Sequence, residues 1–490
     1  MNKWTIILIV IGSLVFLNSL FNGFVWDDEV QIVNNPTIKS LQNIGQAFGG
    51  GTFDTGGAGL AKGFYRPMVT IYYMLVGAIF GQKAFGYHLV QIILHIVNAI
   101  LIFKFFSKFV NEKWAGWTSL IWMIHAGISK TVVYAASVGD VLYTLFGLLA
   151  FINPLYLFPA LLSKESAIIL IPLLLIFNKK KNFIILIVAV FYGLLRLITN
   201  INIPKLDLAP ITQASFYERL LTLPSILGNY LRLIFWPMRL TISQHWVVHN
   251  YRDIQFWGCL IPVIIFFVLL FLILLKIKKR ETWIMFIWFL MGIILISNLI
   301  IPLDGTLDET WLYFPLIGFM GILALYLDFL NKKWLVWILG TTVMLLSIRT
   351  FVRNFEWHDG LTLYGQAIKN SPPSYELENN YGVELFRNKQ ILEAKPHFEK
   401  SIELQPRWWF AYNNLGAVYQ RGGDLEKAEN LYIKSIERAD YHLAYENLAI
   451  ILLNKKNPEK TNAFVKSALK KFPQNAILNE ILRLNNPLPK

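Results

Sequence analysis

The amino-acid sequence predicts an all-α protein that combines a polytopic helical membrane bundle with a C-terminal α-solenoid of tetratricopeptide repeats. The 490-residue chain is 55% hydrophobic and only 16% charged, whereas soluble domains are about a quarter charged. Apolar runs of near-membrane length recur between residues 4 and 350. After residue 375, small and aromatic residues recur with a period of 33 to 34 residues, which is typical of tetratricopeptide repeats.

The membrane domain is expected to cover residues 1–350 and to contain about eleven transmembrane helices, because roughly 20 apolar residues cross a bilayer. The apolar runs lie at residues 4–22, 87–107, 114–128, 131–149, 150–162, 166–178, 182–199, 255–277, 281–302, 310–329 and 332–350. The first run follows a basic start and also resembles a secretory signal peptide. We favour an uncleaved helix, because no clear small-x-small cleavage site follows it.

The net charge of +14 is distributed in a way that indicates membrane topology. Residues 375–490 contain 17 basic and 14 acidic side chains, so the apolar part holds 28 of the 45 basic and 17 of the 31 acidic residues. Much of this excess lies in short clusters between apolar runs, as topology determinants do. We therefore expect no nucleic-acid partner. The single cysteine, Cys259, excludes an internal disulfide and a zinc site built on several thiolates.

Basic clusters predict how the bundle is oriented. The cytoplasmic clusters are Lys3, residues 179–181, 276–280 and 332–333. All of them agree with one topology if residues 216–240, which carry three arginines and two prolines, lie in the interface or re-enter. A charged helix within the bundle is the alternative. This topology places residues 23–86, and the chain after about residue 350, outside the membrane.

The repeat domain is expected to cover residues 355–490, with a half repeat at 359–373 and repeats at about 375–408, 409–441 and 442–475. The recurring positions are Gly382, Ala394, Phe398, Ser401 and Pro406, then Gly416, Ala428, Tyr432, Ser435 and Asp440, then Ala449, Thr461, Val465, Ala468 and Pro473. Stacked helix pairs form a concave surface that suits extended peptides. Trp408, Trp409 and Asn414 are candidates to line it. Alternatively, the tryptophans fill the core between repeats, and the solenoid is only a scaffold.

Two neighbouring carboxylates, Asp27 and Asp28, follow the first apolar run and the aromatic sequence "FVW". An apolar neighbourhood raises the pKa of a carboxylate, which suits proton abstraction near neutral pH. The pair is therefore a candidate catalytic site. Helix capping or loop hydrogen bonding is the alternative explanation.

Other polar residues lie in or beside the predicted helices. His88 and His95 are seven residues apart and share one helix face. Since no carboxylate or cysteine lies nearby at ligand spacing, we expect no metal site, and hydrogen bonding within the bundle is the simpler interpretation. Lys164 and Glu165 lie at a predicted outer helix boundary, where the lysine can reach a lipid phosphate or pair with the glutamate.

Several segments occur in the order known from one enzyme family. They are "VWDDEVQIVNNPTI", "YRP", "YHLVQIILHIVNAIL", "SKESAIILIP", "YLRLIFWPMRLT", "SNLIIPL", "WLYFP" and "RNFEWHDGLTLYGQAIKNSP". Together they resemble the transmembrane and tetratricopeptide repeat-containing O-mannosyltransferases, which are glycosyltransferases of the GT-C type. The resemblance covers nearly the whole chain.

The resemblance implies transfer of mannose or a similar hexose from a polyprenyl-phosphate donor to Ser or Thr hydroxyls of an exported protein. Asp27 is then expected to deprotonate the acceptor hydroxyl, with Asp28 as a second ligand or alternate base. The candidates to bind donor phosphate or lipid are Arg66, Lys164, Glu165, His88 and Lys130. No metal or other cofactor is required, since the leaving phosphate needs no protonation. The partners are the lipid donor, membrane lipids and a protein acceptor bound by the repeats.

The sequence departs from the family pattern at several positions. The family has proline where Ala126 stands, glutamate at Lys130 and arginine at Val138, and its glutamate-arginine pair reads here Glu309 and Thr310. Two expected arginines are absent, and Lys130, with Lys164 and Arg66, is expected to supply the replacement charge. We expect a prokaryotic plasma membrane, with the catalytic loop and repeats on the outer face.

Three other functions are compatible with the composition. A transporter or flippase is expected to contain inverted repeats, and the sequence has none. A membrane-anchored scaffold for envelope complexes needs only the repeats. A third alternative is a GT-C enzyme that acts on a glycan or lipid, with the repeats recruiting partners.

Overall fold

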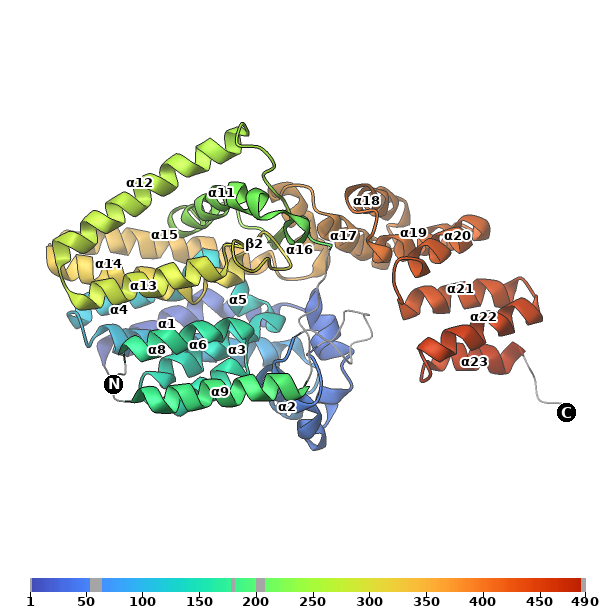
Figure 1. The fold of residues 1–490 in the computed structure, drawn as a ribbon, viewed down its shortest axis with the longest axis horizontal. Coiled ribbons are helices and arrows are strands. Elements are labelled where there is room, and N and C mark those ends of the chain that lie inside the picture. Colours follow the sequence, from blue (N-terminus) through green and yellow to red (C-terminus); the bar gives the residue numbers. More distant parts are fainter. Residues whose placement is uncertain (1, 53–63, 178–180, 200–207, 486–490) are drawn as a thin grey trace. The chain divides into compact units, whose positions relative to one another are not determined.

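A computed structural model describes residues 2–52, 64–177, 181–199 and 208–485. The chain divides into two compact units, which meet in sequence between Leu363 and Tyr364. The described residues are almost entirely helical (Figure 1). Their one sheet pairs β1 (Ser243–Gln244) with β2 (Leu307–Asp308) in antiparallel register. The all-α prediction is confirmed.

Five helical segments of the described residues are long and apolar enough to cross a membrane. They are α1 with the following 3-10 turn η1 (Lys3–Phe21), α3 (Ala84–Phe106), α9 (Asn182–Thr199), α12 (Ile254–Ile277) and α15 (Leu335–Phe355). α9 and α12 expose many apolar side chains, as helices in contact with lipid do. The protein is therefore a membrane protein, but the predicted number of about eleven spans is not confirmed.

The other helices of the first unit are shorter or, like the 20-residue α11, less apolar, and some break the predicted apolar runs. They are α2 (Pro67–Phe80), α4 (Glu112–Met123), α5 (Lys130–Val133), α6 (Val138–Ala150), α7 (Leu157–Leu161), α8 (Leu170–Phe177), α10 (Pro210–Gln213), α11 (Phe216–Phe235), α13 (Arg280–Leu295) and α14 (Pro315–Leu330). Residues 131–149 do not form one helix, because Tyr134 has extended dihedral angles (φ −101°, ψ 112°) and separates α5 from the turn η6 (Ala135–Ser137).

The predicted outer loop at residues 23–86 contains several short helical elements. They are η2 (Glu29–Val33), η3 (Thr37–Lys39), η4 (Leu41–Phe48) and α2. Residues 53–63 of this loop lie outside the described residues, as do residues 179 and 180 of one basic cluster. α11, which covers much of the charged segment 216–240, packs against α12 and is absent from the apolar helices of membrane length.

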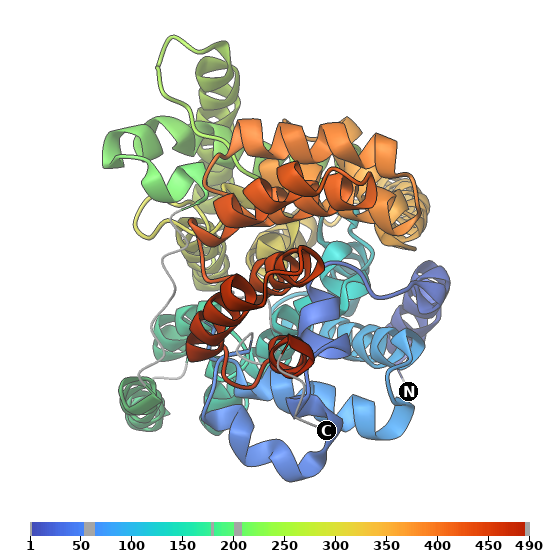
Figure 2. The ribbon, with the colours of Figure 1, turned by 90° about the vertical axis from the view of Figure 1, so that its right-hand side faces the viewer.

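The second unit consists of paired helices that lie side by side (Figure 2). They are α16 (Gly360–Asn370), α17 (Tyr375–Arg387), α18 (Ile391–Leu404), α19 (Trp409–Arg421), α20 (Leu425–Ile436), α21 (His442–Asn454), α22 (Pro458–Lys471) and α23 (Ala476–Asn485). The recurring glycines allow the paired helices to approach closely. A Cβ atom at Gly416 would lie 2.7 Å from the Tyr432 ring, and one at Gly382 would lie 2.7 Å from the Phe398 ring. The glycine recurs in the first two repeats because the aromatic ring of the paired helix leaves no room for a side chain there.

We predict that Gly416→Ala destabilises the second unit by about 1–3 kcal/mol, because overpacking forces the Tyr432 ring or the helices to shift. Hydrogen exchange of α19 and α20 in the full chain measures this change. Gly422→Ala is the matched control, since a Cβ atom there meets only backbone oxygens at 3.5 Å or beyond. If the backbone amides of α19 and α20 exchange equally slowly in the Gly416 variant and in the parent chain, a side chain at position 416 does not disturb the packing and the prediction is wrong.

Candidate active site

Asp28 anchors the loop that follows the first membrane helix. It is fully buried, and its carboxylate accepts the backbone N–H of Val25 at 3.1 Å and that of Ala136 at 2.7 Å. Burial raises the pKa of Asp28 well above its ordinary value, although the two N–H donors oppose the shift. The loop hydrogen bonding considered above as an alternative therefore does occur at Asp28.

Asp27 is half-buried and lies beside an aromatic stack. Its backbone N–H donates to the Tyr134 hydroxyl at 3.2 Å. The Tyr134 ring stacks on Trp26, with centroids 5.5 Å apart, and also packs against Trp357 at 5.3 Å. Trp26 has a left-handed backbone (φ 56°), which is uncommon for a bulky residue and is held here by these contacts. Tyr134 thus positions the loop, and no motif in the sequence pointed to it.

The two cations expected at the outer boundary each pair with a carboxylate. Arg66, at the start of α2, contacts Glu165 at 2.9 Å. Lys164 contacts Asp140 at 2.6 Å, so the alternative ion pair of Lys164 with Glu165 is not formed. Asp140 lies in the first turn of α6 and was not singled out from the sequence.

Tyr73 links the two acids with this cationic cluster. The hydroxyl of Tyr73, on α2, lies 3.4 Å from the carbonyl of Ala135, and the next residue, Ala136, donates its N–H to Asp28. The same hydroxyl donates to Gln31 Oε1 at 3.2 Å. The first unit therefore joins the loop of the candidate catalytic carboxylates to α2, the helix that begins after Arg66.

Lys130 is almost fully buried, and its charge is already neutralised. Its Nζ donates to Asp308 at 2.6 Å and to the carbonyl of Ile242 at 2.7 Å. It also lies 4.9 Å from the centre of the Trp26 ring. Although burial opposes ionisation of Asp308, Lys130 and Thr310 hold the pKa of Asp308 below its ordinary value. Lys130 thus joins the β1–β2 region to the aromatic stack.

A second buried ion cluster surrounds Glu309. Arg353, near the end of α15, contacts Glu309 at 3.2 Å and also pairs with Glu356. Glu309 additionally accepts the backbone N–H of Thr241. Glu309 thus has an arginine partner from α15, although the next residue in sequence is Thr310.

The two histidines on α3 have different surroundings. His95 is hydrogen-bonded to the Tyr313 hydroxyl and to the carbonyl of Met123, each at 2.8 Å, which agrees with a structural function. His88 is buried, and its ring nitrogens have no hydrogen-bond partner among the described residues. Within those residues, no group of three or more His, Cys, Asp or Glu side chains is arranged to hold a metal ion.

The candidate peptide-binding residues of the repeats take part in packing and in a row of amides. Trp408 is buried against Tyr375, with centroids 5.0 Å apart, and it also contacts Trp409 at 5.5 Å. Asn414 donates to Asn379 at 2.9 Å. One repeat further on, Asn447 donates to Asn413 at 3.0 Å. Asparagines therefore meet between consecutive repeats.

Comparisons with known proteins identify a repeat family and several related proteins. The family model described as "Tetratricopeptide repeat" matches residues 411–442. A protein O-mannosyl-transferase of Caenorhabditis elegans is 25% identical over 82% of this chain and 63% of its own length. Protein O-mannosyl-transferase TMTC3 of Homo sapiens is 24% identical over 96% of this chain and 61% of its own length. The resemblance seen in the sequence is confirmed.

The similarity has limits that matter for function. The chain spans about three fifths of the length of these relatives. Protein O-mannosyl-transferase TMTC1 of Homo sapiens is 23% identical over 83% of this chain and 56% of its own length. A solved structure titled "Crystal structure of APC/C hetero-tetramer Cut9-Hcn1" is 13% identical over 86% of this chain and 92% of its own, with a TM-score of 0.28, which is too low to inform the fold.

We predict that Lys130→Met destabilises the first unit by about 3–5 kcal/mol, because Asp308 is left as a buried charge without its cation. Thermal unfolding of the detergent-solubilised chain measures the loss. The double variant Lys130→Met, Asp308→Asn removes both charges and keeps an acceptor for Thr310, so it should recover most of the stability. A double variant as unstable as the single one would show that the ion pair is not the cause.

Proposed function

We propose that this protein is an integral membrane glycosyltransferase that transfers mannose or a similar hexose from a polyprenyl-phosphate donor to Ser or Thr hydroxyls of an exported protein. The observation that carries the proposal is the loop in which buried Asp28 fixes the half-buried Asp27, and which Tyr73 joins to α2, the helix that begins after Arg66. Its similarity to proteins named O-mannosyl-transferases supports the reaction class.

Asp27 is the proposed general base, and Asp28 positions it. Both Asp28 oxygens accept backbone N–H groups, so this carboxylate holds the loop in its conformation. Asp27 is more accessible to solvent than Asp28. Asp27 accepts the proton of the acceptor hydroxyl, whose oxygen attacks the anomeric carbon from the face opposite the phosphate. The bond between that carbon and the phosphate oxygen breaks, and the carbon inverts. Polyprenyl phosphate leaves with the bonding electrons.

The charge that develops on the leaving phosphate is proposed to be stabilised by Arg66 and Lys164. Their carboxylate partners, Glu165 and Asp140, hold both cations in place before substrate binds. Preorganised cations in a site with little water stabilise developing charge strongly. The reaction needs no metal or other cofactor. We place the enzyme in the plasma membrane, with the loop and repeats outside the cell.

The repeats are proposed to recruit the acceptor protein. Side-chain amides both donate and accept hydrogen bonds, so the row that includes Asn379, Asn413, Asn414 and Asn447 suits the backbone of an extended segment. Holding the acceptor near the membrane raises its local concentration at the loop.

We predict that Asp27→Asn lowers the transfer rate by about 10²–10⁴-fold while donor binding is retained, because the general base is lost. The transfer rate is measured as label passing from a polyprenyl-phosphate hexose to protein, in membranes that contain the variant or the parent chain in equal amount. The control Asp253→Asn replaces an exposed carboxylate and keeps its helix cap. Full activity of Asp27→Asn would sink the catalytic assignment, and absence of transfer by the parent chain from any donor would favour the scaffold.

We predict that Asn414→Ala raises the KM for a protein acceptor about three- to tenfold, through loss of a hydrogen bond, and leaves the KM for the donor unchanged. Initial rates at varied acceptor and varied donor separate the two constants. Asn388→Ala is a matched control, because Asn388 donates only to the carbonyl of Glu384 within its own helix turn. Equal acceptor KM values for both variants and the parent would argue against recruitment by this row.

A further inference from the structure

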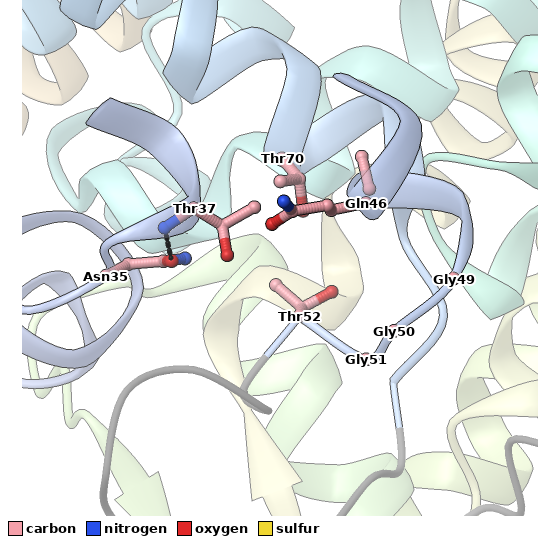
Figure 3. Close-up of a pocket in the computed structure, with 9 residues that line it drawn as sticks. Asn35, Thr37, Gln46, Gly49, Gly50, Gly51, Thr52 and Thr70 are labelled. Atoms are coloured by element: carbon pink, nitrogen blue, oxygen red, sulfur yellow. Dashed lines mark hydrogen bonds between the residues drawn. The ribbon is translucent and has the colours of Figure 1, made fainter. Parts of the chain in front are cut away.

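A pocket lies in the first outer loop, between η3, η4 and the first turn of α2 (Figure 3). Its volume is about 340 Å³, and pockets of roughly 300–1,000 Å³ typically hold small molecules. The described residues that line it are Asn35, Thr37, Gln46, Ala47, Gly49, Gly50, Gly51, Thr52 and Thr70. No charged side chain is among them, which separates this pocket from the ion pairs of the candidate active site.

Three polar groups of the pocket remain available to a ligand. Figure 3 shows Thr37, Gln46 and Thr70 around a common space. Among the described residues, the hydroxyls of the buried Thr37 and Thr70 have no hydrogen-bond partner, although most buried polar groups have one, and Oε1 of the exposed Gln46 has none either. Two other lining groups are engaged, because Asn35 accepts the Thr37 N–H at 3.0 Å and Thr52 donates to Phe64 O at 3.0 Å.

The chemistry of the lining favours an uncharged polyol. A hydroxyl or amide can donate to one ligand hydroxyl and accept from another. Among the described lining residues a phosphate or carboxylate meets no cation, and desolvating an unpaired charge is costly. Gly49 and Gly50 follow the C-terminal end of η4, and because they have no side chain a ligand can approach the backbone there. A sugar ring matches these groups.

The pocket is built on the same elements as the candidate active site. Asn35 donates to the carbonyl of Gln31, and Gln31 accepts the hydroxyl of Tyr73. The backbone N–H of Thr70 donates to the carbonyl of Arg66 at 3.3 Å, so a pocket hydroxyl and a phosphate candidate lie one helical turn apart. A neutral ring and an adjacent phosphate can thus be bound by neighbouring parts of one structure.

We propose that this pocket binds the neutral ring of a hexose, a choice of ligand that rests on the proposed function. Two sources can supply such a ring: the head group of the polyprenyl-phosphate donor, or a sugar already attached to the acceptor. Thr70 and Gln46 are the residues assigned to recognise its hydroxyls.

The test is equilibrium binding to the full chain in lipid nanodiscs. The probes are polyprenyl-phosphate mannose, polyprenyl phosphate without sugar, and a peptide with one mannosylated serine. Thr70→Val removes a hydroxyl at constant shape, Thr70→Ser restores it, and Gln46→Ala removes the amide. Gln42→Ala is the control, because Gln42 is exposed on the same η4 and does not line the pocket.

We expect Thr70→Val and Gln46→Ala each to weaken binding of a mannose-bearing probe about three- to tenfold, as the loss of one hydrogen bond does. Thr70→Ser and Gln42→Ala should bind the mannose-bearing probes as tightly as the parent chain does. The affinity for polyprenyl phosphate without sugar should be the same for every variant. Weaker binding of the lipid donor alone identifies its head group as the ligand, and weaker binding of the peptide alone identifies the acceptor sugar. Unchanged binding of both probes overturns the proposal. Because binding is measured without turnover, a chain that binds mannose here but transfers none would refute only the proposed function.

Discussion

The candidate active site depends on one buried carboxylate that accepts two backbone N–H groups. Burying Asp28 is costly unless its oxygens are hydrogen-bonded, and the donors come from Val25, within its own loop, and from Ala136, more than a hundred residues later. The loop therefore takes this conformation only when the turn η6 is in place. That turn exists because Tyr134 breaks the apolar run, and the same Tyr134 accepts the backbone N–H of Asp27. The helix break at Tyr134 therefore provides both long-range hydrogen bonds that hold the loop: Ala136 N–H to Asp28, and Asp27 N–H to Tyr134.

The paired charges around this loop are better explained by function than by stability. A buried ion pair rarely contributes more than well-packed apolar residues of the same size, since desolvation offsets most of the attraction. Lys130 with Asp308, Lys164 with Asp140 and Arg66 with Glu165 nevertheless all lie in the first unit. In the proposed function, the carboxylates of Glu165 and Asp140 orient Arg66 and Lys164 for an incoming anion, whereas Lys130 is buried and already neutralised by Asp308. The absence of two family arginines is therefore compatible with anion binding through cations held by other partners.

Local patterns made part of this structure predictable from the sequence. Apolar runs and the recurring glycine and aromatic positions act within one helix or one helix pair, so they predicted the repeats and the five apolar helices of membrane length, but not the number of spans. Partners from distant segments carry no such signal: Asp140 and Asp308 lie in no motif, and nothing near Lys130 indicates that it meets β2. The break at Tyr134 was missed because its neighbours are as apolar as those of an unbroken helix. Asp28 was found, but its bond to Ala136 was not.

In the proposed function, the neutral pocket and the ion pairs bind two chemically different parts of one substrate. A hexosyl phosphate has a ring that needs hydroxyl and amide partners and a phosphate that needs cations. The start of α2 carries one of each, with Arg66 and Thr70 one turn apart, or about 5.4 Å along the axis. A ligand bound to both groups has its ring and its phosphate ordered along α2. Since Tyr73 on the same helix donates to Gln31 in the loop of Asp27 and Asp28, α2 also fixes the proposed base relative to the pocket. Such an arrangement lowers the entropic cost of reaching the reactive geometry, because the helix has already ordered the groups that must meet.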